Sequence, residues 1–380
     1  VLVVVTGGSK GIGRSCVESF AKRGARVLFT YCSDAAAAQQ VEHSFHPQGR
    51  VQGRRLDQGD FDSVRAFTAE VNRWREGREI STVVNNAALG SATVSAYGGL
   101  PPPGSHGAAA TGEWSGAEDY ESARRRADED MAMMRVNSLG PMWVTEALLP
   151  MMRPLKVVGA SDKPAGTETS AAAAAATADG EESAAPAPAP AAGKSPDDEG
   201  LGRGGRAPAF PSFVGMDNKK KTVLFVGSVG GGSQSVFPGF RAADAMSKAA
   251  VAYACKYFAA QSRQQINRNR SPAPASATQP AAHDLNGASG GVDYVCLCPG
   301  ATLTDMFRRS TLDSMEAKGP GELERFLNAL PQGRLMLPEE IGEAVYWLCS
   351  CPAATMFHGA VIDASAGLAV RPGVLTEYSF

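Results

Sequence analysis

The chain alternates short apolar runs with segments of helical periodicity, a pattern typical of a parallel sheet covered by helices. Residues 1–5 are all apolar and mostly β-branched, as expected of a strand that is buried on both faces. A helical pattern follows to about Arg23, and Gly24 ends it. The further strands that we predict lie at 26–31, 51–56, 80–84, 222–226, 292–297 and 359–363. This alternation predicts an α/β fold with a doubly wound parallel sheet.

Three segments break this pattern and are interpreted as insertions on the surface. They cover about 91–130, 159–216 and 263–291 and are rich in Ala, Gly, Pro and Ser. Sequence of this composition buries too little apolar surface to offset its ordering entropy, which predicts loop or disorder. What remains has about the length of one doubly wound domain. We therefore expect a single Rossmann-type domain over 1–380 that carries long low-complexity insertions.

Composition and charge exclude several classes of function. The 37 basic and 39 acidic residues give a net charge of -2, too little to attract nucleic acid or an anionic membrane. No apolar run reaches the ~18 residues that a membrane span needs. The seven cysteines form no CxxC pair, and most lie in apolar segments, which favours buried reduced thiols over metal or disulfide sites. We expect a cytoplasmic protein that binds a small-molecule substrate, and neither nucleic acid nor a membrane.

A glycine-rich loop joins the first strand to the first helix, over residues 6–13. Glycines at 7, 11 and 13 allow a tight turn and a close approach of the backbone to a phosphate, while the helix N-terminus supplies amide donors. Because strand, glycine loop and helix follow one another in this order, the segment predicts a dinucleotide site.

The end of the second predicted strand bears on the choice between NADP and NAD. Tyr31 and Ser33 stand where a carboxylate would hydrogen-bond the ribose 2'-hydroxyl of NAD. Lys10 and Arg14 are nearby cations that suit a 2'-phosphate. We therefore expect NADP(H) as the cofactor, with NAD the less favoured alternative, and we interpret Asp34 as the N-cap of the next helix.

Polar residues follow the third and fourth predicted strands. Asp57 comes after the third, and the segment Asn85-Asn86-Ala87-Ala88 comes after the fourth. The carboxyl ends of neighbouring parallel strands line the crevice in which such sheets bind ligands. These residues are therefore expected to face the same ligand as the glycine-rich loop.

Together, the glycine motif, Asp57 and the Asn85-Asn86-Ala87 segment resemble the short-chain dehydrogenase/reductase family, although Ala88 stands where the family has glycine. The resemblance implies an oxidoreductase with a nicotinamide cofactor. It implies that Asp57 faces the adenine and Asn86 the nicotinamide side, and that family members commonly form homodimers or homotetramers. The other cofactor-binding residues that it implies are Thr6, Gly7, Ser9, Lys10, Gly11, Ile12, Gly13, Tyr31, Lys248, Pro299, Gly300 and Thr304.

The second half of the chain carries the catalytic part of the resemblance. Asn137 resembles the family's asparagine that holds a water in the proton relay, and Ser228 resembles the serine that hydrogen-bonds the substrate carbonyl. Lys248 matches the lysine of the family's Tyr-x-x-x-Lys motif. Asp244 stands in the place of the tyrosine, and no tyrosine lies between residues 222 and 252.

An aspartate changes the chemistry that this position can perform. Aspartic acid has a pKa of about 3.9, so a carboxylate has almost no proton to give at neutral pH. Lys248, one helical turn on, is expected to form an ion pair with Asp244. Loss of a positioned general acid typically lowers a rate by ~100- to 10,000-fold. Ketone reduction with Asp244 as the acid is therefore disfavoured.

Three interpretations follow from the aspartate. In the first, an NADP(H)-dependent oxidoreductase obtains its proton elsewhere, from water on Ser228 or from Tyr97 or Tyr120. In the second, the substrate is a cationic iminium ion, which needs hydride but no proton. In the third, the chain is an NADP-binding pseudo-enzyme or regulatory subunit without redox turnover. Retention of the asparagine, serine and lysine favours an active enzyme.

Overall fold

The computed structural model describes residues 1–46, 49–91, 93–101, 120–152, 220–232, 241–269, 291–308 and 312–370. The predicted insertion at 159–216 lies outside the described residues, as do 102–119 and 270–290. Residues 155–212 separate as a unit of their own and belong to that undescribed part. The description below concerns the remaining unit.

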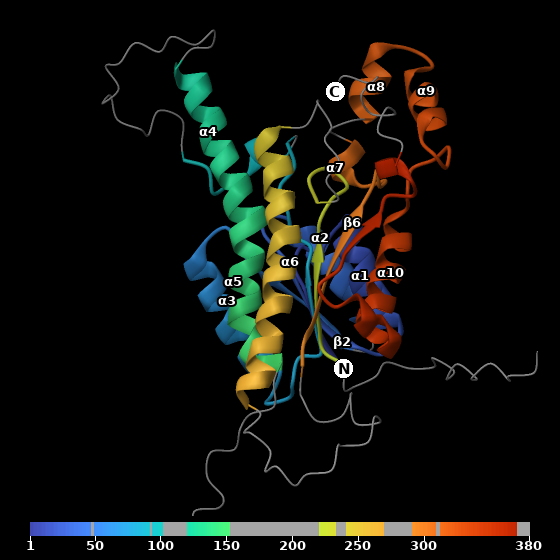
Figure 1. Cartoon of the computed structure of the whole chain (residues 1–380). Coiled ribbons are helices and arrows are strands. Elements are labelled where there is room, and N and C mark those ends of the chain that lie inside the picture. Colours follow the sequence, from blue (N-terminus) through green and yellow to red (C-terminus); the bar gives the residue numbers. More distant parts are fainter. Residues whose placement is uncertain are drawn as a thin grey trace, which may run out of the picture. The chain divides into compact units, whose positions relative to one another are not determined.

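Seven parallel strands form one sheet in the order β3-β2-β1-β4-β5-β6-β7 (Figure 1). The strand order reverses between β1 and β4, which makes this the switch point where open α/β sheets bind ligands. The predicted doubly wound parallel sheet is therefore confirmed. The strands are β1 Leu2–Val5, β2 Arg26–Tyr31, β3 Val51–Arg55, β4 Thr82–Asn85, β5 Thr222–Val226, β6 Asp293–Pro299 and β7 Val361–Ala364.

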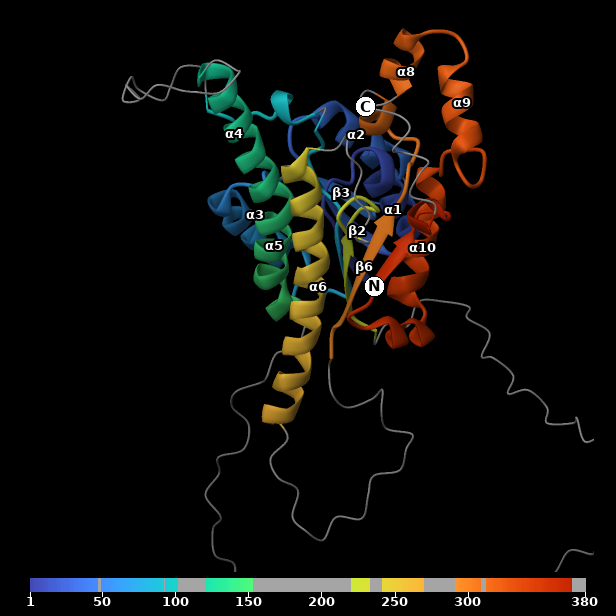
Figure 2. The ribbon, with the colours of Figure 1, turned by 45° about the horizontal axis from the view of Figure 1, so that its top comes forward.

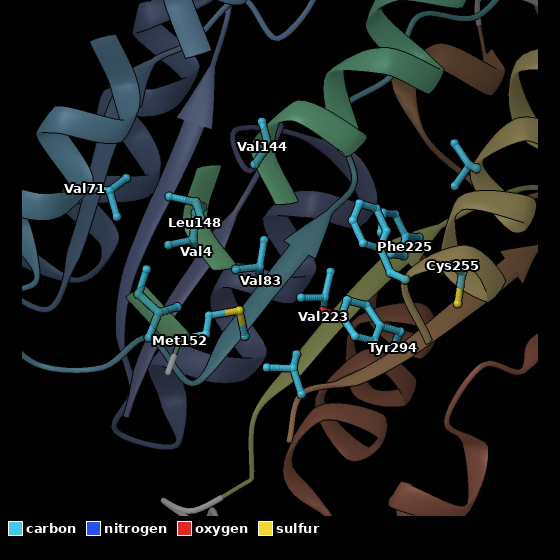
Figure 3. Close-up of a cluster of buried hydrophobic side chains, with 14 of the residues drawn as sticks. Val4, Val71, Val83, Val144, Leu148, Met152, Val223, Phe225, Cys255 and Tyr294 are labelled. Atoms are coloured by element: carbon cyan, nitrogen blue, oxygen red, sulfur yellow. The ribbon is translucent and has the colours of Figure 1, made fainter. Parts of the chain in front are cut away.

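The central strands are buried on both faces. All residues of β1, β4 and β5 are buried, which explains why β1 and β5 are mostly apolar without alternation. Along β1, Val4 packs into the cluster on one face of the sheet, whereas Val3 and Val5 pack into the cluster on the other. Figure 3 shows the first of these clusters, with Val4, Val83 and Val223 pointing to the same side.

Helices cover both faces of the sheet. Figures 1 and 2 show α3, α4, α5 and α6 on one side and α1 and α10 on the other, and the two core clusters agree with this division. The helices are α1 Gly11–Lys22, α2 Ala35–Ser44, α3 Phe61–Trp74, α4 Tyr120–Met134, α5 Gly140–Leu148, α6 Ala242–Asn269, α7 Asp305–Phe307, α8 Asp313–Lys318, α9 Glu322–Ala329 and α10 Pro338–Ser350. Shorter helical segments are η2 Val94–Ala96, the π-helical η3 Arg135–Leu139, η4 Leu149–Met152, η7 Pro352–Phe357 and η8 Leu368–Val370.

Helix α4 corrects the predicted boundaries of the first insertion. It begins at Tyr120, so residues 120–130 are helical and not loop. The sequence of this helix is mostly polar, so no apolar face is evident in it. Ion pairs along the helix stabilise it, such as the pair between Arg124 and Asp128 one turn on. Arg241, just before α6, joins α4 to α6 through Glu129 at 2.6 Å. Helix α6 likewise continues to residue 269, past the start predicted for the third insertion.

A small apolar cluster lies beyond the carboxyl ends of the strands. Phe326 of α9 is fully buried there, against Leu312 and Met315 near α8 and Val229 after β5. In Figure 2, α8 and α9 lie together at this end of the sheet. Helix α9 therefore stands above the strand ends (Figure 2).

The burial of the cysteines agrees with their apolar sequence context. All seven cysteines are free thiols; six are buried and Cys32 is exposed, as predicted for most of them. No described helix is long and apolar enough to cross a membrane. Within the described ranges, no group of three or more His, Cys, Asp or Glu side chains could hold a metal ion.

Phe258 tests the core beneath α6. Its ring stacks on Tyr294 at 5.6 Å and on Phe225 at 6.2 Å, and the residue is 5% exposed. We predict that Phe258→Ala lowers the free energy of unfolding by about 3–5 kcal/mol. Tyr253→Ala on the same helix is the control, because Tyr253 is 72% exposed. Urea denaturation measures both, and equal effects of the two substitutions would contradict this packing.

Candidate active site

The glycine-rich loop lies at the carboxyl end of β1, beside the switch point. Gly7 and Gly11 have φ values of +66° and +51°, which glycine adopts without strain. The amide of Gly7 donates to Thr30 Oγ1 at 3.1 Å, which ties the loop to β2. A Cβ atom on Gly13 would lie 2.1 Å from the Gly7 carbonyl oxygen. Helix α1 can therefore pack this closely on the loop only with glycine at position 13.

The N-terminus of α1 fits a phosphate group. Its N-cap residue, Lys10, makes no side-chain cap, so the first amides of the helix are not satisfied by a capping side chain. Ser9, Gly11 and Ile12 are partly exposed around these amides. A partly exposed, uncapped helix start on a glycine loop is suited to bind an anion such as a pyrophosphate.

Thr6 and Asn86 join the loop after β1 to the loop after β4. The hydroxyl oxygen of Thr6 accepts hydrogen bonds from the amides of Asn86 and Ala87, both at 3.0 Å. In return, Asn86 Nδ2 donates to the carbonyl oxygens of Thr6 at 3.0 Å and Gly7 at 3.1 Å. The amide group of Asn86 therefore holds the glycine-rich loop in place, a role that the sequence did not reveal.

The cations near the predicted ribose site have acidic partners. Lys10 forms an ion pair with Asp34, and Arg14 forms one with Glu18 at 2.9 Å. Asp34 Oδ1 accepts from the amide of Ala37 at 2.9 Å, which confirms Asp34 as the N-cap of α2. The hydrogen bond from Lys10 is the main reason that the pKa of Asp34 lies below its usual value.

Arg55 is a third cation at this edge and was missed in the sequence. It lies opposite Tyr31 in the β2–β3 register, and its Nε donates to the carbonyl oxygen of Cys32 at 3.3 Å. Among the described residues it forms no ion pair. Its place at the end of a strand next to Tyr31 brings a second positive charge to the region where we expected a 2'-phosphate.

Asp57 is engaged by Tyr97. The tyrosine hydroxyl lies 2.7 Å and 2.8 Å from the two carboxylate oxygens of Asp57, and the amide of Gly59 donates to Oδ1 at 3.0 Å. Burial and then the bond to Asp57 raise the pKa of Tyr97. The phenol is thus held at the end of β3, and the structure does not support Tyr97 as the proton donor at position 244.

Tyr120 is also distant from position 244. Glu129 of α4 pairs with Arg241, three residues before Asp244, and Tyr120 lies nine residues before Glu129 at the start of the helix. At a rise of 1.5 Å per residue, this separation is about 14 Å along α4. The structure therefore places neither candidate tyrosine beside Asp244.

Asn137 lies in the π-helical segment η3, between α4 and α5. Pro141 follows four residues later and has no amide to donate to the Asn137 carbonyl, a local cause of a break in the α-helix. The Asn137 side chain accepts from the amide of Leu89 at 2.7 Å and donates to the Leu89 carbonyl at 2.8 Å. It thereby fixes the loop after β4 against the helix.

Ser247 connects this asparagine to α6. Its hydroxyl oxygen accepts from Asn137 Nδ2 at 3.0 Å and donates to the carbonyl oxygen of Asp244 at 2.7 Å. Ser247 has no exposed surface. A chain of hydrogen bonds therefore runs from Leu89 through Asn137 and Ser247 to Asp244. No role for Ser247 was predicted from the sequence, although it directly precedes Lys248.

Asp244 is paired with Ser91 and not with Lys248. Its Oδ2 accepts from the Ser91 amide at 3.2 Å and from the Ser91 hydroxyl at 2.9 Å, and the residue is 7% exposed. In the described part of the chain it makes no ion pair, so the predicted pair with Lys248 is wrong. The short aspartate side chain instead reaches the loop after β4, which supplies two donors.

Lys248 is partly buried on the first turns of α6. Burial lowers its pKa, and the charge of Asp244 opposes this effect without cancelling it. The sulfurs of Cys296 and Cys298, which lie 3.9 Å apart on β6, are close enough to act on it as well. Lys248 thus stands between Asp244 and the end of β6.

Ser228 lies in a turn after β5 that packs on α6. Its hydroxyl oxygen accepts from the amide of Gly230 at 3.2 Å. A Cβ atom on Gly231 would lie 2.1 Å from the Ala245 carbonyl oxygen, so the turn touches the helix beside Asp244. Within the described residues, no hydrogen bond joins Ser228 directly to Asp244, Asn137 or Lys248.

The segment after β6 lies over the loops that follow β1 and β4. The Pro299 carbonyl oxygen accepts from the amide of Val229 at 2.9 Å, and the Gly300 amide donates to Ala364 at 3.4 Å. Farther on, Thr304 Cγ2 lies 3.2 Å from where a Gly11 Cβ would be, and Met306 Sδ lies 2.9 Å from where a Gly90 Cβ would be. The segment after β6 thus contacts both the glycine-rich loop, through Thr304, and the loop after β4, through Met306.

The pH dependence of stability tests the environment of Lys248. Its pKa is lower in the folded chain than the unfolded value of 10.5, so the charged lysine destabilises the fold below the folded pKa. That penalty shrinks as the pH rises from the folded pKa to 10.5, because the folded chain has then released the proton. We predict that Lys248→Met is more stable than wild type near pH 7, and that the difference falls toward pH 10. The exposed Lys256→Met is the control, and a difference that grows with pH in urea unfolding would contradict the prediction.

The first part of the chain is similar in sequence to known proteins. Residues 1–100 match the sequence profile of a family described as short chain dehydrogenase. A short-chain dehydrogenase/reductase, FrzI of Cladobotryum sp, is 36% identical over 91 residues, which is 23% of this chain and 33% of that protein. An L-rhamnose 1-dehydrogenase (NADP(+)) of Thermoplasma acidophilum is 38% identical over 88 residues, 23% of this chain and 34% of that protein. The chain thus spans about a third of the length of these relatives.

Solved structures share the fold along nearly the whole chain. The RhlG/NADP active-site complex of Pseudomonas aeruginosa has a TM-score of 0.57 at 17% identity, and covers 97% of this chain and 96% of that one. An actinorhodin polyketide ketoreductase variant with NADPH has a TM-score of 0.58 at 16% identity, with 97% of each chain covered. Over its first 100 residues the chain is thus similar to the short-chain dehydrogenase/reductase family, and the solved structures share its fold.

Proposed function

We propose that the chain is an NADP(H)-dependent oxidoreductase that transfers hydride to or from a carbonyl or imine carbon of a small molecule. One observation carries the proposal. The phosphate-binding loop and the Asn137–Ser247–Asp244 hydrogen-bond chain meet at the same loop after β4, through Asn86 on one side and Leu89 on the other. A dinucleotide cradle and a set of polar side chains thus share one edge of the sheet.

The cofactor assignment rests on the shape and charge of this edge. Gly13 is packed so closely on Gly7 that a side chain is excluded, and the uncapped start of α1 offers amides to a pyrophosphate. Arg55, opposite Tyr31, supplies positive charge for a 2'-phosphate, and Lys10 would exchange its partner Asp34 for that phosphate. A relative named as NADP(+)-dependent and similar folds solved with NADP or NADPH support the same choice.

Each residue of the site has a role in this scheme. The bound cofactor supplies or accepts the hydride. The start of α1 binds the phosphates, and Lys248 is suited to bind the nicotinamide ribose. The oxygen of the Ser228 hydroxyl accepts from the Gly230 amide, and its proton could be donated to the oxygen of a carbonyl substrate. Asn137 and Ser247 hold α6 in register with the loop after β4, and Met306 covers Gly90 to exclude water.

Asp244 does not act as the proton donor in this scheme. Both hydrogen bonds from Ser91 are donated to Asp244 Oδ2, which acts only as an acceptor in them. A carboxylate offers only acceptors. A proton for a carbonyl substrate would therefore reach it through water on Ser228.

NADPH binding tests the proposal through Lys10. Fluorescence titration should show that the protein binds NADPH at least ~10-fold more tightly than NADH, since a hydrogen bond to a charged group contributes ~1.5–3 kcal/mol. Lys10→Ala should weaken NADPH binding by ~10-fold or more and leave NADH binding nearly unchanged. Lys22→Ala, at the other end of α1, is the matched control. Absence of NADPH binding to the wild type would refute the proposed function.

A further inference from the structure

We infer that the substrate of this site is a cation, an iminium ion whose positive charge lies against Asp244. The inference rests on the proposed function, because it names the class of substrate for the same hydride transfer. It starts from the charge state and partners of one carboxylate. Asp244 is 7% exposed and lies where the short-chain dehydrogenase/reductase family has a neutral phenol.

The carboxylate of Asp244 is only half satisfied. Ser91 donates both of its hydrogen bonds to Oδ2, and within the described residues Oδ1 accepts none. Those residues also provide no cation within ion-pair distance. Oδ1 retains some contact with solvent, so a ligand can reach it, and water screens little of an ion pair that forms at such a mostly buried position. The site therefore gains from a ligand that brings a positive charge to Oδ1.

The neighbouring cations do not fill this need. Arg241 precedes Asp244 by three residues, but its guanidinium is bonded to Glu129 at 2.6 Å and Asp130 at 2.5 Å. Lys248 is one turn away, and in the described part of the chain it forms no ion pair with Asp244. The negative charge at position 244 thus remains available to a ligand.

The Asp244 carboxylate lies near the place where the reacting part of a substrate would be expected. Asp244 contacts Ser91, which directly follows Gly90, and Gly90 lies under Met306 of the segment after β6. Leu89 of the same loop is held by Asn137. The charge therefore lies on the loop that leads from Asn86 and the glycine-rich loop, so a cation bound there stands beside the expected nicotinamide.

An iminium ion explains why the site works without a tyrosine. Hydride from the reduced cofactor forms a new C–H bond at the iminium carbon, and the π electrons of the C=N bond become the lone pair of a neutral amine. NADPH is oxidised to NADP⁺ and the substrate is reduced, so electrons and charge balance with no proton transfer. A ketone needs a proton on its oxygen, which a carboxylate cannot give. Asp244 also favours the protonated form of an imine, which accepts hydride more readily.

The binding test uses a fixed charge that cannot react. N,N-dimethylpiperidinium is titrated into the NADP⁺-loaded protein by calorimetry. The inference predicts that Asp244→Asn weakens binding by ~10-fold or more, because a neutral amide replaces the charged partner. Asp62→Asn on α3 is the control for loss of an acidic side chain, since Asp62 is exposed at the surface, and it should bind as the wild type does. Equal affinity of wild type and Asp244→Asn would overturn the inference.

The turnover test compares two substrates of the same ring size. NADPH oxidation is followed with an N-methyl cyclic iminium salt and with cyclohexanone. The wild type should show a kcat/KM for the iminium at least ~100-fold above that for the ketone. Loss of a general acid typically lowers the rate of ketone reduction by at least this factor. Asp244→Asn should lower the iminium value and not the ketone value, and Asp244→Tyr should raise the ketone value.

The outcomes separate this inference from the proposed function. If NADPH binds and the wild type reduces cyclohexanone as well as the iminium, the inference is overturned and the oxidoreductase remains. If NADPH does not bind, both are overturned. NADPH titration of Asp244→Asn shows that the variant is folded, because the cofactor cradle lies outside the substituted residue.

Discussion

The two hydrogen bonds from Ser91 to Asp244 determine how the rest of the site can operate. They hold a carboxylate, and not a phenol, at the start of α6, and they face it toward the loop after β4. Asn137 and Ser247 fix the same helix and the same loop from the other side. The position of the charge is thus fixed by the loop after β4, by η3 and by α6, which are far apart in the sequence. It therefore depends on the tertiary structure.

The frame of the fold could be predicted because its signals are local. β1 and β5 are mostly apolar runs that are buried on both faces, and a glycine pattern follows β1. The part of α4 at 120–130 was assigned to loop because its polar sequence shows no apolar periodicity, and ion pairs such as Arg241 with Glu129, more than 100 positions apart, help to stabilise it. Composition alone does not reveal pairings at that separation.

Most residues of the candidate site were predicted from the sequence, but the contacts between them were not. Asn137, Lys248 and Asp244 all lie on elements that meet around one loop, yet the expected pair of Lys248 with Asp244 gave way to Ser91. Ser91 lies in a segment without regular pattern, and no local signal marks it as a partner. Ser247 and Arg55 were missed for a similar reason, because their roles depend on which strand or helix lies opposite.

The central claim is that Asp244 supplies charge and that the hydride transfer needs no proton. A single-turnover measurement of NADPH oxidation by a cyclic imine that carries no N-methyl group, and whose nitrogen can therefore take up a proton, tests this most directly when run in H₂O and in D₂O. The account predicts equal rates in the two solvents, because no exchangeable proton moves in the step. A clearly slower rate in D₂O would contradict it, since a proton would then be in flight during the transfer.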